Sequence, residues 1–69
     1  MASYIGSSVD KLTREQVEVA VFEAYYSRGY YFAVEMVGAI APLCAHDVLI
    51  HVMVLLNNVA LEDIQLHIH

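Results

Sequence analysis

Hydrophobic residues recur with a helical period between Arg14 and Arg28. One continuous stripe along such a helix contains Val17, Ala20, Val21, Ala24 and Tyr25. A second stripe, on the nearly opposite side, contains Val19, Phe22 and Tyr26 and leaves only a narrow polar seam. The first stripe can pack against the rest of the chain, whereas the second stripe needs another partner.

Signals at the two ends of this segment favour a helix over a strand. Thr13 can cap the first turn, and Gln16 follows at the capping-box spacing. Gly29 is expected to end the helix or turn the chain, as glycine does after a helix C-terminus. The stretch VEVAVF also alternates in the manner of a strand, but the cap, the length and the glutamate content predict a helix.

The two segments that follow are almost uncharged. A helix over Tyr31–Ala41 contains Glu35 as its one charged residue, which is typical of a helix covered on most sides. Pro42 is expected to end that helix. A third helix is predicted to begin with Asp47 as its N-cap and to stop at the two asparagines 57–58.

The segment 59–69 fits two structures. Leu61, Ile64 and Ile68 share one face of a helix, whereas Ile64, Leu66 and Ile68 share one face of a strand. Residues 1–12 lack periodicity and are expected to form a flexible N-terminal arm before a single domain, 13–69. The predicted fold class is all-α: a small helical hairpin, a third helix, and a short C-terminal helix or extended tail, with the helix preferred.

The chain has more hydrophobic surface than a domain of its size can bury. Its 69 residues are 59% hydrophobic, and the single cysteine, Cys44, cannot form an internal disulfide. A domain this small buries only about 60% of the surface that its unfolded chain exposes. We therefore expect the excess to face another chain, identical or different, and we expect the protein not to function as an isolated monomer.

Charge and hydropathy exclude several classes of partner. The formal net charge is −5, and the basic residues are Lys11, Arg14 and Arg28. Nucleic acids and anionic membranes bind through cationic side chains, so neither is an expected partner. The start MASYIGSSVD lacks the pattern of a signal peptide, and no apolar run reaches the length of about 20 residues that a membrane span needs. These features predict a cytoplasmic protein.

Residues that could carry chemistry are few and scattered. The candidate metal ligands are Cys44, His46, His51, His67 and His69. Structural zinc takes four N or S ligands at short recurring spacings, which these residues lack. A Cys–His nucleophile would have no oxyanion hole, and no Gly-rich phosphate loop occurs. We expect no enzyme activity, no metal, no cofactor and no small-molecule substrate.

The hairpin segment resembles a tetratricopeptide repeat. In AYYSRGYY, Tyr25, Gly29 and Tyr31 have the spacing of that motif's tyrosine, turn glycine and following aromatic. Val21 and Ala41 fall where the motif has a leucine and a late alanine. The departures are Glu18 for tryptophan, Val34 for an early small residue, Gly38 for a late aromatic, and an early Pro42. The short chain and its stretch SRGYYFAVEMV are also similar to the tetratricopeptide-like chaperones of type III secretion systems.

That resemblance implies a groove of apolar side chains that sequesters an amphipathic helix of a client in the cytoplasm. The expected partner-binding residues are Val19, Phe22, Tyr26, Tyr30, Met36, Ile40 and Met53. The leading hypothesis is a small protein-binding module, a chaperone or adaptor for a partner such as a needle subunit or its co-chaperone. The alternative is a self-associating structural or regulatory homo-oligomer, of the inhibitor type, that buries the same faces.

Overall fold

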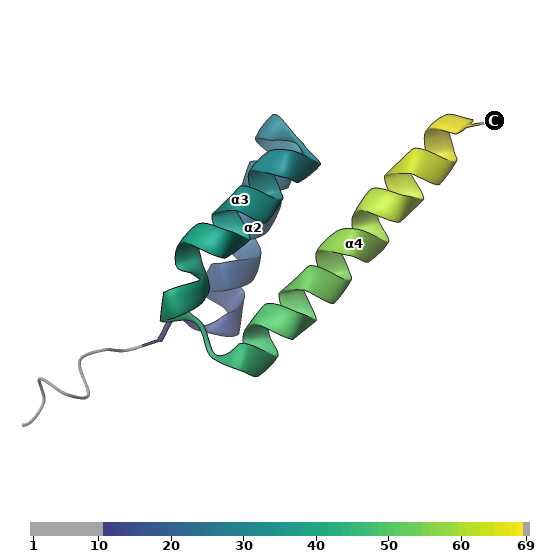
Figure 1. Cartoon of the computed structure of the whole chain (residues 1–69). Helices are drawn as coiled ribbons and strands as arrows, with labels where there is room; N and C mark the ends of the chain where they lie inside the picture. The colour runs from purple at the N-terminus through teal and green to yellow at the C-terminus, as the bar shows by residue number, and fades with distance from the viewer. Residues whose placement is uncertain (1–10, 69) are drawn as a thin grey trace, which may run out of the picture.

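The computed structural model describes residues 11–68, and this part of the chain is all-α (Figure 1). It contains α2 (Arg14–Arg28), α3 (Tyr30–Ile40), a 3₁₀ turn (Ala41–Leu43) and α4 (His46–Ile68). The predicted fold class is therefore confirmed. Residues 1–10 of the predicted N-terminal arm, and His69, lie outside the described residues.

The first turn of α2 is held by the predicted capping box. The backbone N–H of Gln16 donates to the Thr13 Oγ1 over 3.1 Å, and the backbone N–H of Thr13 donates to the Gln16 Oε1 over 2.9 Å. These bonds satisfy two backbone donors that the start of the helix would otherwise leave without a partner. Both the cap and the predicted span of this helix are confirmed.

Gly29 alone connects α2 to α3. Its backbone N–H donates to the carbonyl oxygen of Tyr25 over 2.8 Å, and its carbonyl oxygen accepts from the N–H of Ala33 over 3.1 Å. Its φ of +99° and ψ of −178° fall in a region that is essentially restricted to glycine. One residue can therefore end one helix and start the next, and the predicted turn is confirmed.

The next boundaries differ slightly from the prediction. α3 covers Tyr30–Ile40 rather than Tyr31–Ala41, and Pro42 stands within the 3₁₀ turn that follows. α4 begins one residue before Asp47, so that this carboxylate lies in the first helical turn and not at the N-cap. A negative charge in the first turn still interacts favourably with the helix dipole.

The predicted stop of the third helix at residues 57–58 is wrong, because α4 continues unbroken to Ile68. An asparagine within a helix costs only up to about 0.7 kcal/mol relative to alanine. Asn57 also accepts a hydrogen bond of 2.6 Å from the Tyr30 hydroxyl, so a long-range contact offsets the weak local preference. The expected C-terminal helix exists, but as the continuation of the third helix.

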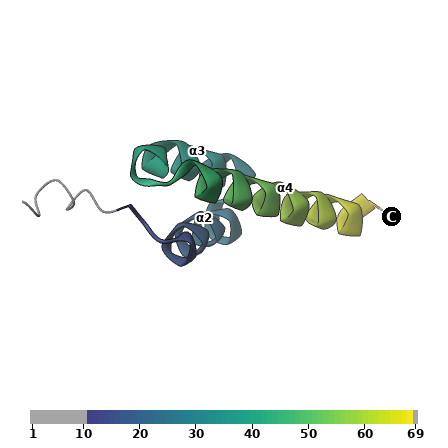
Figure 2. The same ribbon diagram turned by 90° about the horizontal axis from the view of Figure 1, so that it is seen from below.

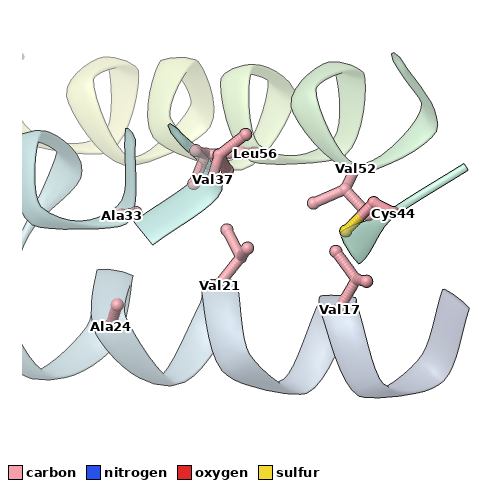
Figure 3. Close-up of a cluster of buried hydrophobic side chains, with 8 residues drawn as sticks. All are labelled: Val17, Val21, Ala24, Ala33, Val37, Cys44, Val52 and Leu56. Atoms are coloured by element: carbon pink, nitrogen blue, oxygen red, sulfur yellow. The ribbon is translucent and has the colours of Figure 1, made fainter. Parts of the chain in front are cut away.

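A narrow core joins the three helices (Figure 3). Its buried side chains are Val17, Val21 and Ala24 from α2, Ala33 and Val37 from α3, Cys44 from the connection, and Val52 and Leu56 from α4. The α2 members all belong to the first stripe that the sequence predicts. Tyr25 of that stripe is only partly buried and packs at the edge of the core.

α4 starts beside the end of the hairpin that lies away from Gly29 and diverges from the hairpin along its length (Figures 1 and 2). Just before α4 begins, the carbonyl oxygen of Leu43 accepts a hydrogen bond of 2.8 Å from the backbone N–H of Leu12. A 23-residue helix is about 34 Å long, whereas the 15 residues of α2 span about 22 Å. The C-terminal half of α4 therefore lacks the close helix packing of its first half.

Gly29→Val is expected to destabilise the fold by about 1–3 kcal/mol, because a β-branched residue is strained at this positive φ. No atom lies within 4 Å of the position that a Cβ would occupy, so strain and not a clash is the cause. The free energy of unfolding in urea measures the effect. Gly38→Val is the matched control, since Gly38 lies within α3 and is equally open. It should lose no stability, and equal losses in both variants would contradict the assigned strain.

Candidate functional site

A groove of about 850 Å³ lies between the hairpin turn and the C-terminal half of α4. The hairpin lines it with Tyr25, Tyr26, Gly29 and Tyr30, and α4 lines it with Asn57, Ala60, Leu61, Asp63, Ile64 and His67. The divergence of α4 from the hairpin creates this space, as the two ribbons separate toward the C-terminus (Figure 1). The groove is the candidate functional site.

The two walls of the groove differ in chemistry. The hairpin wall is aromatic: the rings of Tyr25 and Tyr26 meet edge to face with centroids 5.1 Å apart. Tyr26 remains 70% exposed despite this contact. The α4 wall is aliphatic, and its Leu61 and Ile64 are 54% and 55% exposed. An apolar partner can therefore touch ring faces on one side and branched methyl groups on the other.

Two hydrogen bonds cross the groove and join its walls. The Tyr25 hydroxyl donates to the carboxylate of Asp63, and the Tyr30 hydroxyl donates to the Asn57 Oδ1 over 2.6 Å. On α4, the Nδ1–H of His67 donates to the backbone carbonyl oxygen of Asp63 over 2.7 Å. Because these polar groups bond one another, the groove presents mainly ring faces and aliphatic side chains.

The bond to Asp63 raises the pKa of Tyr25 to about 12. The carboxylate holds the hydroxyl proton, and burial and the negative charge of Asp63 act in the same direction. The ordinary tyrosine pKa is about 10. The bond therefore stabilises the fold fully below pH 10 or so, and its contribution is lost as the pH rises through about 12.

The structure places the expected partner-binding residues in three surroundings. Tyr26 and Tyr30 line the groove together. Val19 is exposed on α2 in a separate hollow, beside Glu15 and Glu23. The remaining four, Phe22, Met36, Ile40 and Met53, are partly buried and pack against the core. The second stripe of α2 is thus divided, because Phe22 packs against the core. Its ring stacks on that of Tyr26, with the two ring centroids 6.3 Å apart.

Several groove residues are absent from that expected set. Leu61 and Ile64 had a visible signal, because they share one face of a helix over the C-terminal segment. The paired asparagines at 57–58 predict a helix end, so the sequence does not place Asn57 and the later α4 groove residues on one continuous helix. Tyr25 belongs to the first stripe of α2, and its hydroxyl bonds Asp63, which lies 38 positions away in the sequence.

Other reactive groups lie apart from the groove. Cys44 is buried, and its thiol donates to the carbonyl oxygen of Ile40 over 3.2 Å. His51 Nε2 lies 3.2 Å from a carboxylate oxygen of Glu18. Residues 11–68 bring no three His, Cys, Asp or Glu side chains together in a metal-binding arrangement. In the same range, no helix combines the length and the apolar character that a membrane span requires.

Comparison of the chain with models of known protein families, with curated proteins and with solved structures finds no match. The resemblance to tetratricopeptide-like chaperones therefore stays a prediction. The groove, with its aromatic and aliphatic walls, is the observation from which a function is argued.

Replacement of Tyr25 by Phe should remove one ionisation step near pH 12 from the alkaline titration of the chain's tyrosines. The ultraviolet absorbance of tyrosinate measures this titration. Asp63→Asn should shift that step down toward the ordinary pKa, because an amide carries no charge to hold the proton. Each variant should also lose stability at neutral pH.

Tyr31→Phe is the control, since Tyr31 is 86% exposed and lies outside the groove. Its loss should leave the step near pH 12 in place. If the Asp63→Asn chain keeps that step unchanged, the bond between Tyr25 and Asp63 does not set this pKa.

Proposed function

We propose that the chain is a small protein-binding module whose groove holds the apolar face of an amphipathic helix from another protein. The observation that carries this proposal is the groove itself, in which Tyr26, Leu61 and Ile64 leave half or more of their surface in water. Contiguous exposed apolar surface in a hollow is typical of a site where a partner docks.

The dimensions of the groove suit a helix. Its α4 wall runs from Asn57 to His67, which is about 15 Å of helix, or almost three turns. Helices that lie in grooves use apolar anchors at positions i, i+3 or i+4, and i+7, and three turns supply that set. A segment of this length matches the groove better than an extended peptide, because no strand edge is present within residues 11–68 to pair with one.

The polar groups of the groove argue against a small-molecule site. Such sites use a few unsatisfied polar groups to orient a ligand. Here Asp63 and Asn57 already accept bonds from two tyrosine hydroxyls. What remains for a partner is apolar area, and full burial of one large apolar side chain contributes about 1.5–3 kcal/mol. A few such side chains from a client helix would make a specific complex of moderate affinity.

The net charge of −5 favours a client with basic residues beside its apolar face. In a cell, we propose a chaperone or adaptor role in the cytoplasm. The module would shield an amphipathic helix of a protein such as a type III secretion needle subunit, or would pair with its co-chaperone. The tetratricopeptide-like residues around Gly29 and the exposed aromatic wall support this role.

A synthetic amphipathic helix of about 15 residues, with leucine on one face and lysine on the other, should bind the wild-type chain. Tyr26→Ser should weaken this binding by about tenfold or more, because truncation of an aromatic anchor typically costs above 1 kcal/mol. Tyr31→Ser is the matched control, because Tyr31 is 86% exposed and does not line the groove. Fluorescence anisotropy of the labelled peptide measures both affinities.

A scrambled peptide of the same composition, which lacks the apolar face, should bind much more weakly. Equal binding of both peptides, or an equal loss in the Tyr26→Ser and Tyr31→Ser chains, would contradict the groove as the binding site. The chaperone role has its own test in the native host. A client recovered by mass spectrometry with the wild-type and Tyr31→Ser chains should be missing from the Tyr26→Ser chain.

A further inference from the structure

Residues 57–68, here called the distal segment of α4, have no share in the buried core. Leu56 is the last core residue of the helix, and residues 57–67 are half-buried or exposed. The ribbon of α4 moves away from the hairpin along this segment (Figure 1). Its Leu61, Ile64 and Leu66 each keep more than half of their surface in water. Apolar packing, which supplies most of a helix's stability in a protein, therefore holds the first half of α4 much more firmly than the second.

Two tyrosine hydroxyls fasten the distal segment to the hairpin. The hydroxyl of Tyr25 in α2 donates to the carboxylate of Asp63, and that of Tyr30 in α3 donates to the Asn57 Oδ1 over 2.6 Å. A hydrogen bond requires its two heavy atoms within about 3 Å, so both bonds break when the segment moves away from the hairpin. Together they form a latch, which is closed in this structure.

The bond between Tyr25 and Asp63 is the stronger half of the latch. Its acceptor is a carboxylate, and bonds to charged groups are stronger than bonds between neutral ones. The raised pKa of Tyr25, about 12, has this bond as its main cause. Loss of one such bond typically changes an equilibrium by roughly tenfold. The substitution Tyr25→Phe keeps the ring and removes only the hydroxyl that makes the bond.

Asn57 and Asn58 mark the place where the distal segment can leave the hairpin. Both are exposed and are among the weaker helix formers, because their side chains compete for backbone hydrogen bonds. They follow Leu56 directly, so the end of the core and a weak helical preference coincide. A helix as short as the distal segment is also marginal in water without packing. When the latch opens, the segment therefore unwinds and its backbone N–H groups meet water.

We propose that the distal segment docks on the hairpin and undocks from it as one unit, with the tyrosine latch closed or open, while the core stays folded. In the undocked state the groove loses its α4 wall, which runs from Asn57 to His67. The docking equilibrium thus sets the fraction of chains that have a complete groove. Its effect on a client rests on the proposed function, whereas the docking itself is a property of the free chain.

Native-state hydrogen exchange of the full chain tests whether the segment is one unit. Amides 60–65 should share one degree of protection, at least tenfold lower than that of amides 20–24 in α2. Their exchange should depend little on low concentrations of urea, because undocking exposes a small area. Amides 20–24 should show the steep urea dependence of whole-chain unfolding. Equal urea dependence at both places, or protection that falls residue by residue toward the C-terminus, would overturn the proposal.

Two substitutions separate undocking from global unfolding. Val17→Ala removes packing beside Val52 and Cys44, at the start of α4 (Figure 3), which the docked and undocked states both keep. It should lower the protection of amides 20–24 severalfold and leave that of amides 60–65 unchanged.

Tyr25→Phe removes a bond that only the docked state contains, so it should lower protection at both places by the same factor, roughly tenfold. Tyr31→Phe is the matched control, since Tyr31 is 86% exposed and lies outside the groove. It should change neither set of amides.

Two outcomes in these variants would overturn the proposal. An equal loss of protection at both places in the Val17→Ala chain would show that α4 opens only with the whole chain. Wild-type protection of amides 60–65 in the Tyr25→Phe chain would show that the hydroxyl is no latch. If Val17→Ala does not fold, the two urea dependences of the wild-type chain decide the first question.

The leucine–lysine peptide designed for the groove separates this inference from the proposed function. At a free concentration ten times its dissociation constant, it should raise the protection of amides 60–65 about tenfold, because it binds only the docked state. If the peptide does not bind, the proposed function fails, and exchange of the free chain still decides whether the latch exists. If it protects amides 20–24 but not amides 60–65, it binds without the α4 wall, and the docking equilibrium does not control the site.

Discussion

The hairpin and α4 are held together by one narrow core, in which Leu56 is the largest fully buried side chain and the other fully buried members are valines and an alanine. Such a core contributes little free energy per residue, because each side chain removes a small area from water. It is also confined to the region where α4 lies close to the hairpin, between the 3₁₀ turn and Leu56. Beyond Leu56, the tyrosine hydroxyls of the hairpin, bonded to Asp63 and Asn57, join α4 to the rest of the chain. The groove exists because apolar packing between α4 and the hairpin ends at Leu56, whereas these hydrogen bonds still connect the two beyond that residue.

This division explains the unusual number of exposed aromatic and aliphatic residues. A chain of 69 residues that is 59% hydrophobic has to leave apolar surface in water, and part of that surface lines the groove. Tyr26 contributes to the groove from the hairpin, whereas Ile50 and Val54 are exposed on the first half of α4, outside the groove. From α4 the groove receives Leu61 and Ile64, each about half exposed.

Local signals predicted the hairpin well and the groove poorly. The capping box at Thr13 and the glycine at position 29 act over three or four residues, so the sequence alone reveals them. The continuation of α4 through the asparagines depends on Tyr30, which is 27 positions away. The groove depends on the angle at which α4 leaves the 3₁₀ turn, where Leu43 is bound by Leu12. Contacts between residues so far apart in the sequence leave no periodic pattern in it.

Phe22 shows the same limit, because its place on the helical wheel of α2 indicates an exposed stripe, yet it packs against the core.

The proposed binding of a client has a consequence for the C-terminal half of α4. Any partner that binds only the folded arrangement stabilises that arrangement, in proportion to the logarithm of its concentration over its dissociation constant. A client in the groove would contact the hairpin and α4 together, so that it reinforces the same junction that the Tyr25 and Tyr30 hydroxyls hold. The sparse packing beyond Leu56 is what allows a partner to have this effect, because a helix already rigid on every side would gain nothing from it.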